Sequence, residues 1–75
     1  MDYNKHIVRN PDIMLGKPTI KGTRITVELI MRKLAGGYSI AELMSSYPHI
    51  NADQILSVFE YTADVIANEE VVEMI

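Results

Sequence analysis

The fold of this chain of 75 residues is decided at residues 16–26 by the stretch Gly16-Lys17-Pro18-Thr19-Ile20-Lys21-Gly22-Thr23-Arg24-Ile25-Thr26. Glycine and proline turn signals alternate there with short β-compatible runs, and helical periodicity begins only after them. We therefore expect residues 1–25 to form a short β or extended arm. Because a lone two-stranded hairpin is marginal in water, this arm must lie on the helices or pair with another chain.

A first helical pattern follows the arm. It begins with Thr26 as N-cap, ends near Ala35 and is stopped by Gly36-Gly37. Four apolar residues recur at helical spacing and share one face: Val27, Ile30, Met31 and Leu34. Leu29 falls outside that face and is expected to point outward as a contact residue.

Two further helical patterns carry capping signals at their starts. Ser39 with Glu42 three residues later forms a capping box, and Pro48 ends this second helix. Asn51 with Gln54 forms a similar start for the third helix. We therefore expect three short helices joined by tight connections.

The third helix shows two unlike faces. The apolar face comprises Ile55, Val58, Phe59, Thr62, Ala63 and Ile66. The opposite, polar face comprises Asp53, Ser57, Glu60 and Asp64. Beyond Ile66 the pattern breaks, so the helix is expected to stop near Asn68.

The spacing of the three helices is that of a trihelical helix-turn-helix. We predict a mainly α, homeodomain-like fold in a single domain over residues 1–75. Residues 1–25 form the β arm, residues 26–67 the tri-helical helix-turn-helix, and residues 68–75 a C-terminal tail.

Four strings of the sequence resemble the prokaryotic domain-of-unknown-function family numbered 433. They are Asn10–Ile13, Gly16–Val27, Leu34–Ser39 and Tyr47–Ile50, within a resemblance that covers about residues 7–65. The motif positions that carry over are Pro11, Asp12, Gly16, Pro18, Gly22, Thr23, Arg24, Gly37, Pro48 and Leu56. The resemblance implies a homeodomain-type helix-turn-helix. Members of the family are often encoded beside PIN-like ribonuclease toxins, and some look like VapB-type antitoxins.

Composition limits the kind of protein. Apolar residues make up 48% of the chain, more than so small a domain can bury, so we expect a homo-oligomer, a dimer or higher, or a permanent partner. The chain has no cysteine, which excludes disulfides and thiolate metal sites. No segment looks like a signal peptide or a membrane span, so we expect a cytoplasmic protein.

Charge is divided unevenly along the chain, whose net charge is −3. All of the basic residues lie in the first part: Lys5, Arg9, Lys17, Lys21, Arg24, Arg32 and Lys33. After Ser39 only acidic charges occur: Glu42, Asp53, Glu60, Asp64, Glu69, Glu70 and Glu73. This asymmetry indicates two different kinds of partner, head-to-tail pairing between copies of the chain, or simply two solvated faces.

Nucleic-acid binding is one interpretation. In a helix-turn-helix the N-terminal part of the second motif helix enters the major groove, which would place Asn51 and Gln54 near base edges. The acidic outer face of that helix would repel phosphates, so most of the contact would fall to the arm and the first helix. The candidate residues are Lys17, Lys21, Arg24, Arg32, Lys33, Asn51 and Gln54. For Arg24 a second interpretation stays open, an intramolecular bridge to Asp12 or to a helix C-terminus.

Binding of a protein partner is the other main interpretation. An acidic helix face and an acidic-apolar tail can occupy the basic cleft of a nuclease by charge complementarity. The candidate residues are Leu29, Asp53, Glu60, Asp64, Glu69, Glu70, Val71, Val72 and Glu73. The acidic stripe is also what the solvated face of any amphipathic helix looks like.

Catalysis has little support in the sequence. His6 and His49 are isolated, and there is no metal-ligand spacing or phosphate-binding loop. We expect no enzyme, no catalytic residue, no metal and no cofactor. The function we expect is an antitoxin-like protein that neutralises a PIN-like ribonuclease and can autoregulate transcription at DNA. The alternatives are a DNA-binding regulator without a toxin, or a self-associating module with no nucleic-acid role.

Overall fold

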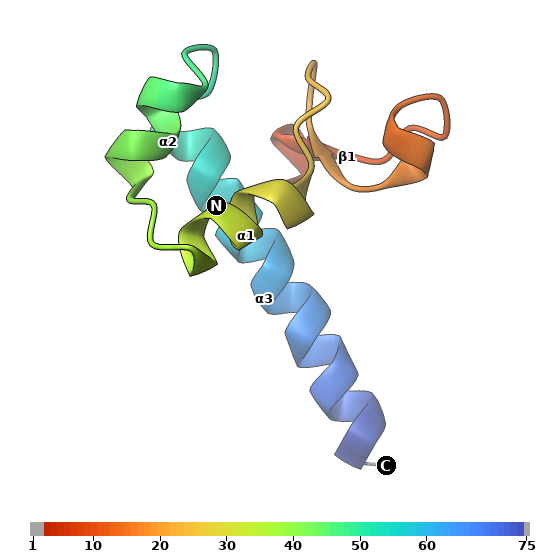
Figure 1. Ribbon diagram of the computed structural model, residues 1–75. Helices are drawn as coiled ribbons and strands as arrows, with labels where there is room; N and C mark the ends of the chain where they lie inside the picture. The colour runs from red at the N-terminus through yellow and green to blue at the C-terminus, as the bar shows by residue number, and fades with distance from the viewer. Residues whose placement is uncertain (1–2, 75) are drawn as a thin grey trace.

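A short N-terminal arm packs on three helices in the computed structural model, which describes residues 3–74, with side chains through Asn68 (Figure 1). The arm holds single 3-10 turns at Tyr3–Lys5 and Met14–Gly16 and two strands, β1 (Ile7–Val8) and β2 (Thr19–Ile20). The helices are α1 (Val27–Ala35), α2 (Ile40–Ser46) and α3 (Ala52–Met74). The predicted mainly α, three-helix domain with a short β arm is confirmed.

The arm folds back onto the helices, as its marginal size requires. Its strands pair antiparallel, with Ile7 opposite Ile20, and both of these side chains are buried. The ring of Tyr3 meets the ring of Tyr61 on α3 edge to face, with centroids 5.5 Å apart. The pair of strands β1 and β2 is therefore stabilised by the apolar surface that the arm covers on α3.

Side-chain caps set the starts of the helices. The Thr26 hydroxyl accepts a hydrogen bond from the main-chain amide of Leu29 at 3.0 Å and begins α1. Ser39 and Glu42 form the complete capping box of α2, with both bonds at 3.1 Å. After α1 the chain reverses through Gly37, whose φ of +101° favours glycine. The predicted starts and the predicted end of α1 are confirmed.

The core lies where the arm meets all three helices. Its buried apolar side chains are Ile7, Ile20, Val27, Ile30, Leu43, Ile50, Ile55 and Val58. Each main element contributes at least one of them, so no element buries its apolar face alone. The arm is thus part of the folded domain and not an appendage.

The predicted end of the third helix is wrong, because α3 continues past Asn68 to Met74. No glycine or proline interrupts residues 67–74, and alanine and glutamate there favour helix, so nothing local stops it. Figure 1 shows the C-terminal half of α3 projecting away from the rest of the domain. The predicted partner residues in this part have side chains outside the described residues: Glu69, Glu70, Val71, Val72 and Glu73.

The faces predicted for α3 also need correction. Ser57 was assigned to the outer face but is completely buried, and its hydroxyl donates to the carbonyl oxygen of Asp53 at 2.9 Å. Ala63 and Ile66 were assigned to the buried face but are exposed. The arm packs on α3 at Tyr61, and the C-terminal half of the helix projects beyond the domain, which leaves Ala63 and Ile66 exposed.

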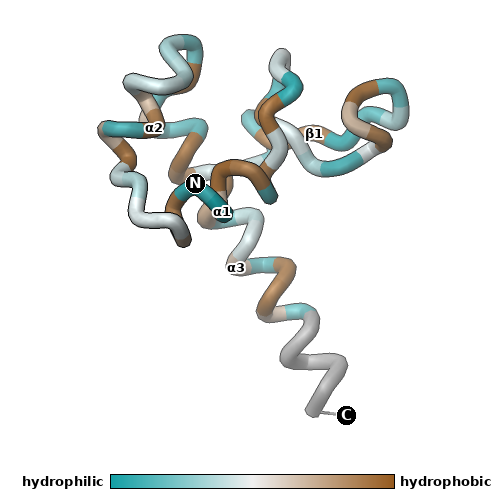
Figure 2. The backbone as a smooth tube through the Cα atoms, viewed as in Figure 1, coloured by the Kyte–Doolittle hydropathy of each residue, from teal (hydrophilic) through white to brown (hydrophobic). Residues whose placement is uncertain are grey.

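Hydropathy alternates along the described turns of α3, as Figure 2 shows. Among the helices of the described residues, none combines the length and the apolar character needed to cross a bilayer.

Candidate interaction surfaces

Two of the predicted nucleic-acid residues are engaged by one carboxylate. Glu28 lies between Lys17, whose Nζ is 3.4 Å from Oε1, and Arg32, whose Nε is 3.0 Å from Oε2. The hydrogen bond from Arg32, followed by that from Lys17, lowers the pKa of the Glu28 carboxyl from its ordinary value. All three side chains are exposed, so these ion pairs are weak and Lys17 and Arg32 can exchange partners at small cost.

Two other cations lie on aromatic rings. The Nζ of Lys33 is 4.8 Å from the centre of the Tyr38 ring at the end of α1. The guanidinium of Arg9 lies over the Tyr61 ring and donates to the Tyr61 hydroxyl. The pairing of Arg9 with Tyr61 has no sequence signal, because 52 residues separate them.

After β2 the chain makes a second tight turn, closed by a hydrogen bond from the Ile20 amide to the Ile25 carbonyl oxygen at 2.9 Å, and we call residues 21–25 the hairpin tip. Its basic residues form no ion pair with a carboxylate of the described residues. Lys21 and Arg24 are exposed on either side of the turn at Gly22, whose φ is +80°. Among the described side chains, no ion pair joins Arg24 to Asp12 or to any other acid. The interpretation of Arg24 as an internal bridge to Asp12 is therefore wrong, and its guanidinium faces solvent.

Asn51 and Gln54 are used to begin α3. The side-chain oxygen of each accepts a hydrogen bond from the main-chain amide of the other. Contact of these oxygens with bases would break the cap, which leaves only their NH₂ groups for that purpose. Ser57, the next polar residue along the helix, is buried and cannot reach a groove.

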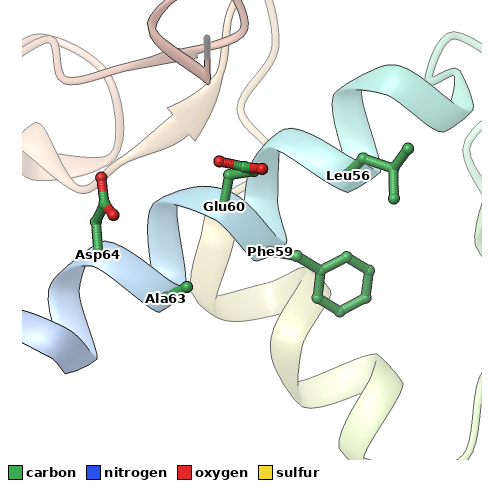
Figure 3. A pocket seen from close by; sticks show the side chains of 5 residues that line it. All are labelled: Leu56, Phe59, Glu60, Ala63 and Asp64. Carbon is green, nitrogen blue, oxygen red and sulfur yellow. The ribbon is translucent and has the colours of Figure 1, made fainter. Parts of the chain in front are cut away.

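The outer side of α3 combines acid and apolar groups. Leu56, Phe59, Glu60, Ala63 and Asp64 line a shallow hollow, which we call the acidic–apolar surface (Figure 3). Glu60 and Asp64 point to one edge of it, whereas Leu56 and Phe59 point toward another. In the described part of the chain no ion pair neutralises these two carboxylates.

Asp53 extends the negative charge of α3 toward its start. It is exposed in the first helical turn, where a carboxylate is favoured by the helix dipole. No ion pair within the described residues involves Asp53. The three predicted acidic partner residues of the helix, Asp53, Glu60 and Asp64, are thus all exposed without a basic neighbour bound to them.

A second hollow lies where two distant segments of the chain meet. Residues 22–25 at the hairpin tip and residues 46–49 at the turn after α2 enclose a cleft of about 350 Å³. We call it the hairpin–turn cleft. Sequence reasoning treated these segments separately, and only the fold brings Arg24 and His49 to one site.

A third exposed feature surrounds Leu29, which is 36% exposed. It lines a hollow together with Met14 and Arg24. Beside Met14, Leu15 is 93% exposed and has a φ of +59°, a left-handed conformation that costs about 1–2 kcal/mol for such a residue. Leu29 is therefore an outward apolar residue as predicted, whereas no sequence pattern indicates the left-handed turn beside it.

Comparison with known proteins places the chain. The family model described as "Protein of unknown function (DUF433)" matches residues 7–62. The chain belongs to the DUF433 family. The match spans both strands of the arm, α1, α2 and the first part of α3, and it ends before Ala63 and Asp64 of the acidic–apolar surface.

One curated relative is similar to part of this DUF433 chain. It is "Uncharacterized protein y4eO" of Sinorhizobium fredii (strain NBRC 101917 / NGR234), 31% identical over 49 residues. The aligned part is 65% of this chain but 22% of the relative, so the chain spans about a fifth of that protein's length. No solved structure matches the chain. Within the described residues, no group of three histidine, cysteine, aspartate or glutamate side chains could hold a metal ion.

Proposed function

We propose that this DUF433 protein is an antitoxin-like binding protein that neutralises a PIN-like ribonuclease. The observation that supports this most is the acidic–apolar surface, where Glu60 and Asp64 stand exposed beside Leu56 and Phe59. The choice of a PIN-like ribonuclease as the partner comes from the family resemblance. The proposal places the protein in the cytoplasm, where such a nuclease and its RNA substrates occur.

The chemistry of the partner explains why this surface suits it. A ribonuclease binds RNA phosphates with basic side chains in a cleft. A row of carboxylates on a partner can pair with the same basic side chains and exclude the RNA. The exposed Leu56 and the half-buried Phe59 can bury apolar area in the contact, where binding energy concentrates. The acidic–apolar surface therefore combines carboxylates that attract a basic partner with apolar side chains that can be buried in the contact.

The proposed mode of action is binding without catalysis. It requires no metal, cofactor or catalytic residue from this chain, since occupation of the nuclease cleft is enough to exclude RNA. The apolar composition supports a further element of the proposal, a dimer or higher homo-oligomer.

Autoregulation at DNA is the second element of the proposal. The exposed Lys21 and Arg24 support it, because they carry positive charge without a carboxylate partner in the described chain. The acidic outer side of α3 would oppose deep insertion of that helix into a groove. We therefore assign DNA contact mainly to the arm and α1.

A pull-down from native cells tests the toxin partner. Tagged wild-type protein is expected to co-purify with a PIN-like nuclease encoded beside it. Glu60→Lys reverses a charge of the acidic–apolar surface and is expected to abolish capture. The matched control Asp12→Lys makes the same change at an exposed site on the arm and should leave capture intact.

Two results would count against the antitoxin proposal. Recovery of wild-type protein with itself alone would favour a self-associating module, and operator DNA without a nuclease would favour a regulator without a toxin. Equal loss of capture by Glu60→Lys and Asp12→Lys would move the binding site away from the acidic–apolar surface.

A further inference from the structure

The hairpin–turn cleft joins two segments that are far apart in sequence. One wall is formed by residues 22–25 of the hairpin tip, and the other is the turn at residues 46–49 that leads into α3. Both segments lie at the end of the domain opposite the projecting half of α3 (Figure 1). The cleft is therefore well separated from the exposed C-terminal half of α3.

The charge of the cleft is positive. Arg24 lines it, is exposed and has no ion pair within the described residues. Lys21 precedes the lining segment and is also exposed at the tip. The residues that line the cleft include no aspartate or glutamate. An anion entering it would thus meet an unneutralised guanidinium and no carboxylate among the lining groups.

The other wall supplies hydrogen-bonding groups and apolar surface. Ser46 and His49 are exposed lining residues with a hydroxyl and an imidazole. Tyr47 and Pro48 between them form a rigid boundary, since proline fixes its own backbone and restricts the residue before it. The donors are thus held on a stiff turn.

We propose that the hairpin–turn cleft binds a phosphate group, with the guanidinium of Arg24 on one wall and the imidazole of His49 on the other. A guanidinium presents a planar fork of donors that matches two phosphate oxygens, and a histidine ring N–H adds one more donor. The phosphate is either that of a nucleic-acid backbone or a free one. The inference rests on the DNA-binding element of the proposed function and names its contact, and it does not depend on the nuclease partner.

A phosphate contact at this place positions a duplex without reading its sequence. Backbone contacts fix orientation but carry no base information. Because the side-chain oxygens of Asn51 and Gln54 remain in the cap of α3, the cleft can hold a strand without rearranging the helix start. Binding through the cleft is therefore expected to be insensitive to sequence and sensitive to salt.

The first arm of the test uses inorganic phosphate. It is titrated at constant ionic strength into isotope-labelled full-length protein, and amide chemical shifts are followed by NMR. The shifts are expected to concentrate at residues 22–25 and 46–49, and to disappear in Arg24→Ala and His49→Ala. Lys5→Ala, which removes an exposed positive charge elsewhere, is the matched control and should keep them.

The second arm uses a duplex DNA of mixed sequence, with binding measured by anisotropy at several salt concentrations. Arg24→Ala is expected to reduce the slope of log K against log salt concentration by about 1, whereas Lys5→Ala leaves it unchanged. Circular dichroism of each variant checks that the fold is kept.

The outcomes distinguish failure of phosphate binding in the cleft from failure of the DNA-binding element of the proposed function. Shifts in the cleft without any duplex binding support a site for free phosphate and overturn the DNA-binding element. Duplex binding whose salt slope is the same in wild type and Arg24→Ala overturns the cleft and leaves DNA binding standing. Phosphate-induced shifts that Arg24→Ala and His49→Ala retain also overturn it.

Discussion

Asn51 and Gln54 cap the same helix reciprocally: the Gln54 side-chain oxygen accepts from the Asn51 amide at 2.8 Å, and the Asn51 side-chain oxygen accepts from the Gln54 amide at 2.9 Å. These are the two residues that the helix-turn-helix pattern would place against base edges. Their role in the cap of α3 therefore competes with hydrogen bonding to DNA bases. Mutations of Asn51 and Gln54 can show whether these residues serve the stability of α3, DNA binding, or both.

Asn51→Ala is expected to lower the free energy of unfolding by about 1 kcal/mol, because the start of α3 loses its side-chain acceptor. Urea denaturation followed by circular dichroism measures the change. Asn51→Ser, which keeps a capping oxygen, is the control and should lie close to wild type. An Asn51→Ala protein as stable as wild type would contradict the structural role of the cap.

Lys21→Glu combined with Arg24→Glu is expected to weaken DNA binding more than Asn51→Ala combined with Gln54→Ala. The first pair reverses exposed charges at the hairpin tip, whereas the second removes groups already engaged in the cap. Anisotropy with one duplex at fixed low salt gives the ranking. The reverse ranking would restore groove reading by α3 as the main mode of binding.

Ser57→Glu is expected to unfold the domain or to lower its stability by several kcal/mol, because Ser57 is fully buried and a larger, charged carboxylate there would lose its hydration. Thermal denaturation measures the loss. Leu56→Glu is the neighbouring control and should be tolerated, since Leu56 is 40% exposed. Equal stability of the two variants would contradict the burial of Ser57 and indicate that it lies on the outer face of α3.

Glu28 gives a pH-dependent contribution to stability. Its folded-state pKa lies below the ordinary value of 4.5, so its ion pairs stabilise the protein above about pH 4.5 and are lost as the pH falls through the folded-state pKa. The free-energy difference between wild type and Glu28→Gln is therefore expected to shrink on acidification. Denaturation at pH 6 and at pH 3 measures it, and a difference that grows toward low pH would contradict the direction.

Leu29→Asp is expected to shift the native mass toward the monomer, since it replaces the exposed apolar side chain of a hollow that Leu29 shares with Met14 and Arg24 by a charge. Native mass spectrometry of both proteins at equal concentration gives the result. Leu29→Ala serves as the milder comparison. An unchanged oligomer in Leu29→Asp would exclude this hollow from the interface, and a monomeric wild type would exclude self-association.

The sequence determined the elements of this protein through signals that act within a few residues. Thr26, Ser39 and Asn51 start helices by accepting hydrogen bonds from nearby main-chain amides, and Gly36-Gly37 and Pro48 stop them for local steric reasons. These effects do not depend on residues elsewhere in the chain. Three helices behind a β arm could therefore be predicted.

The tertiary structure alone decided which faces are covered. The apolar period of α3 did not reveal that the arm packs at Tyr61, that Ser57 is buried or that Ile66 is exposed. Nor could local patterns bring Arg24 and His49 to one cleft, because contacts between distant residues depend on the packing of every element between them. Burial and shared surfaces are properties of the assembled elements, whereas caps and turns belong to the segments themselves.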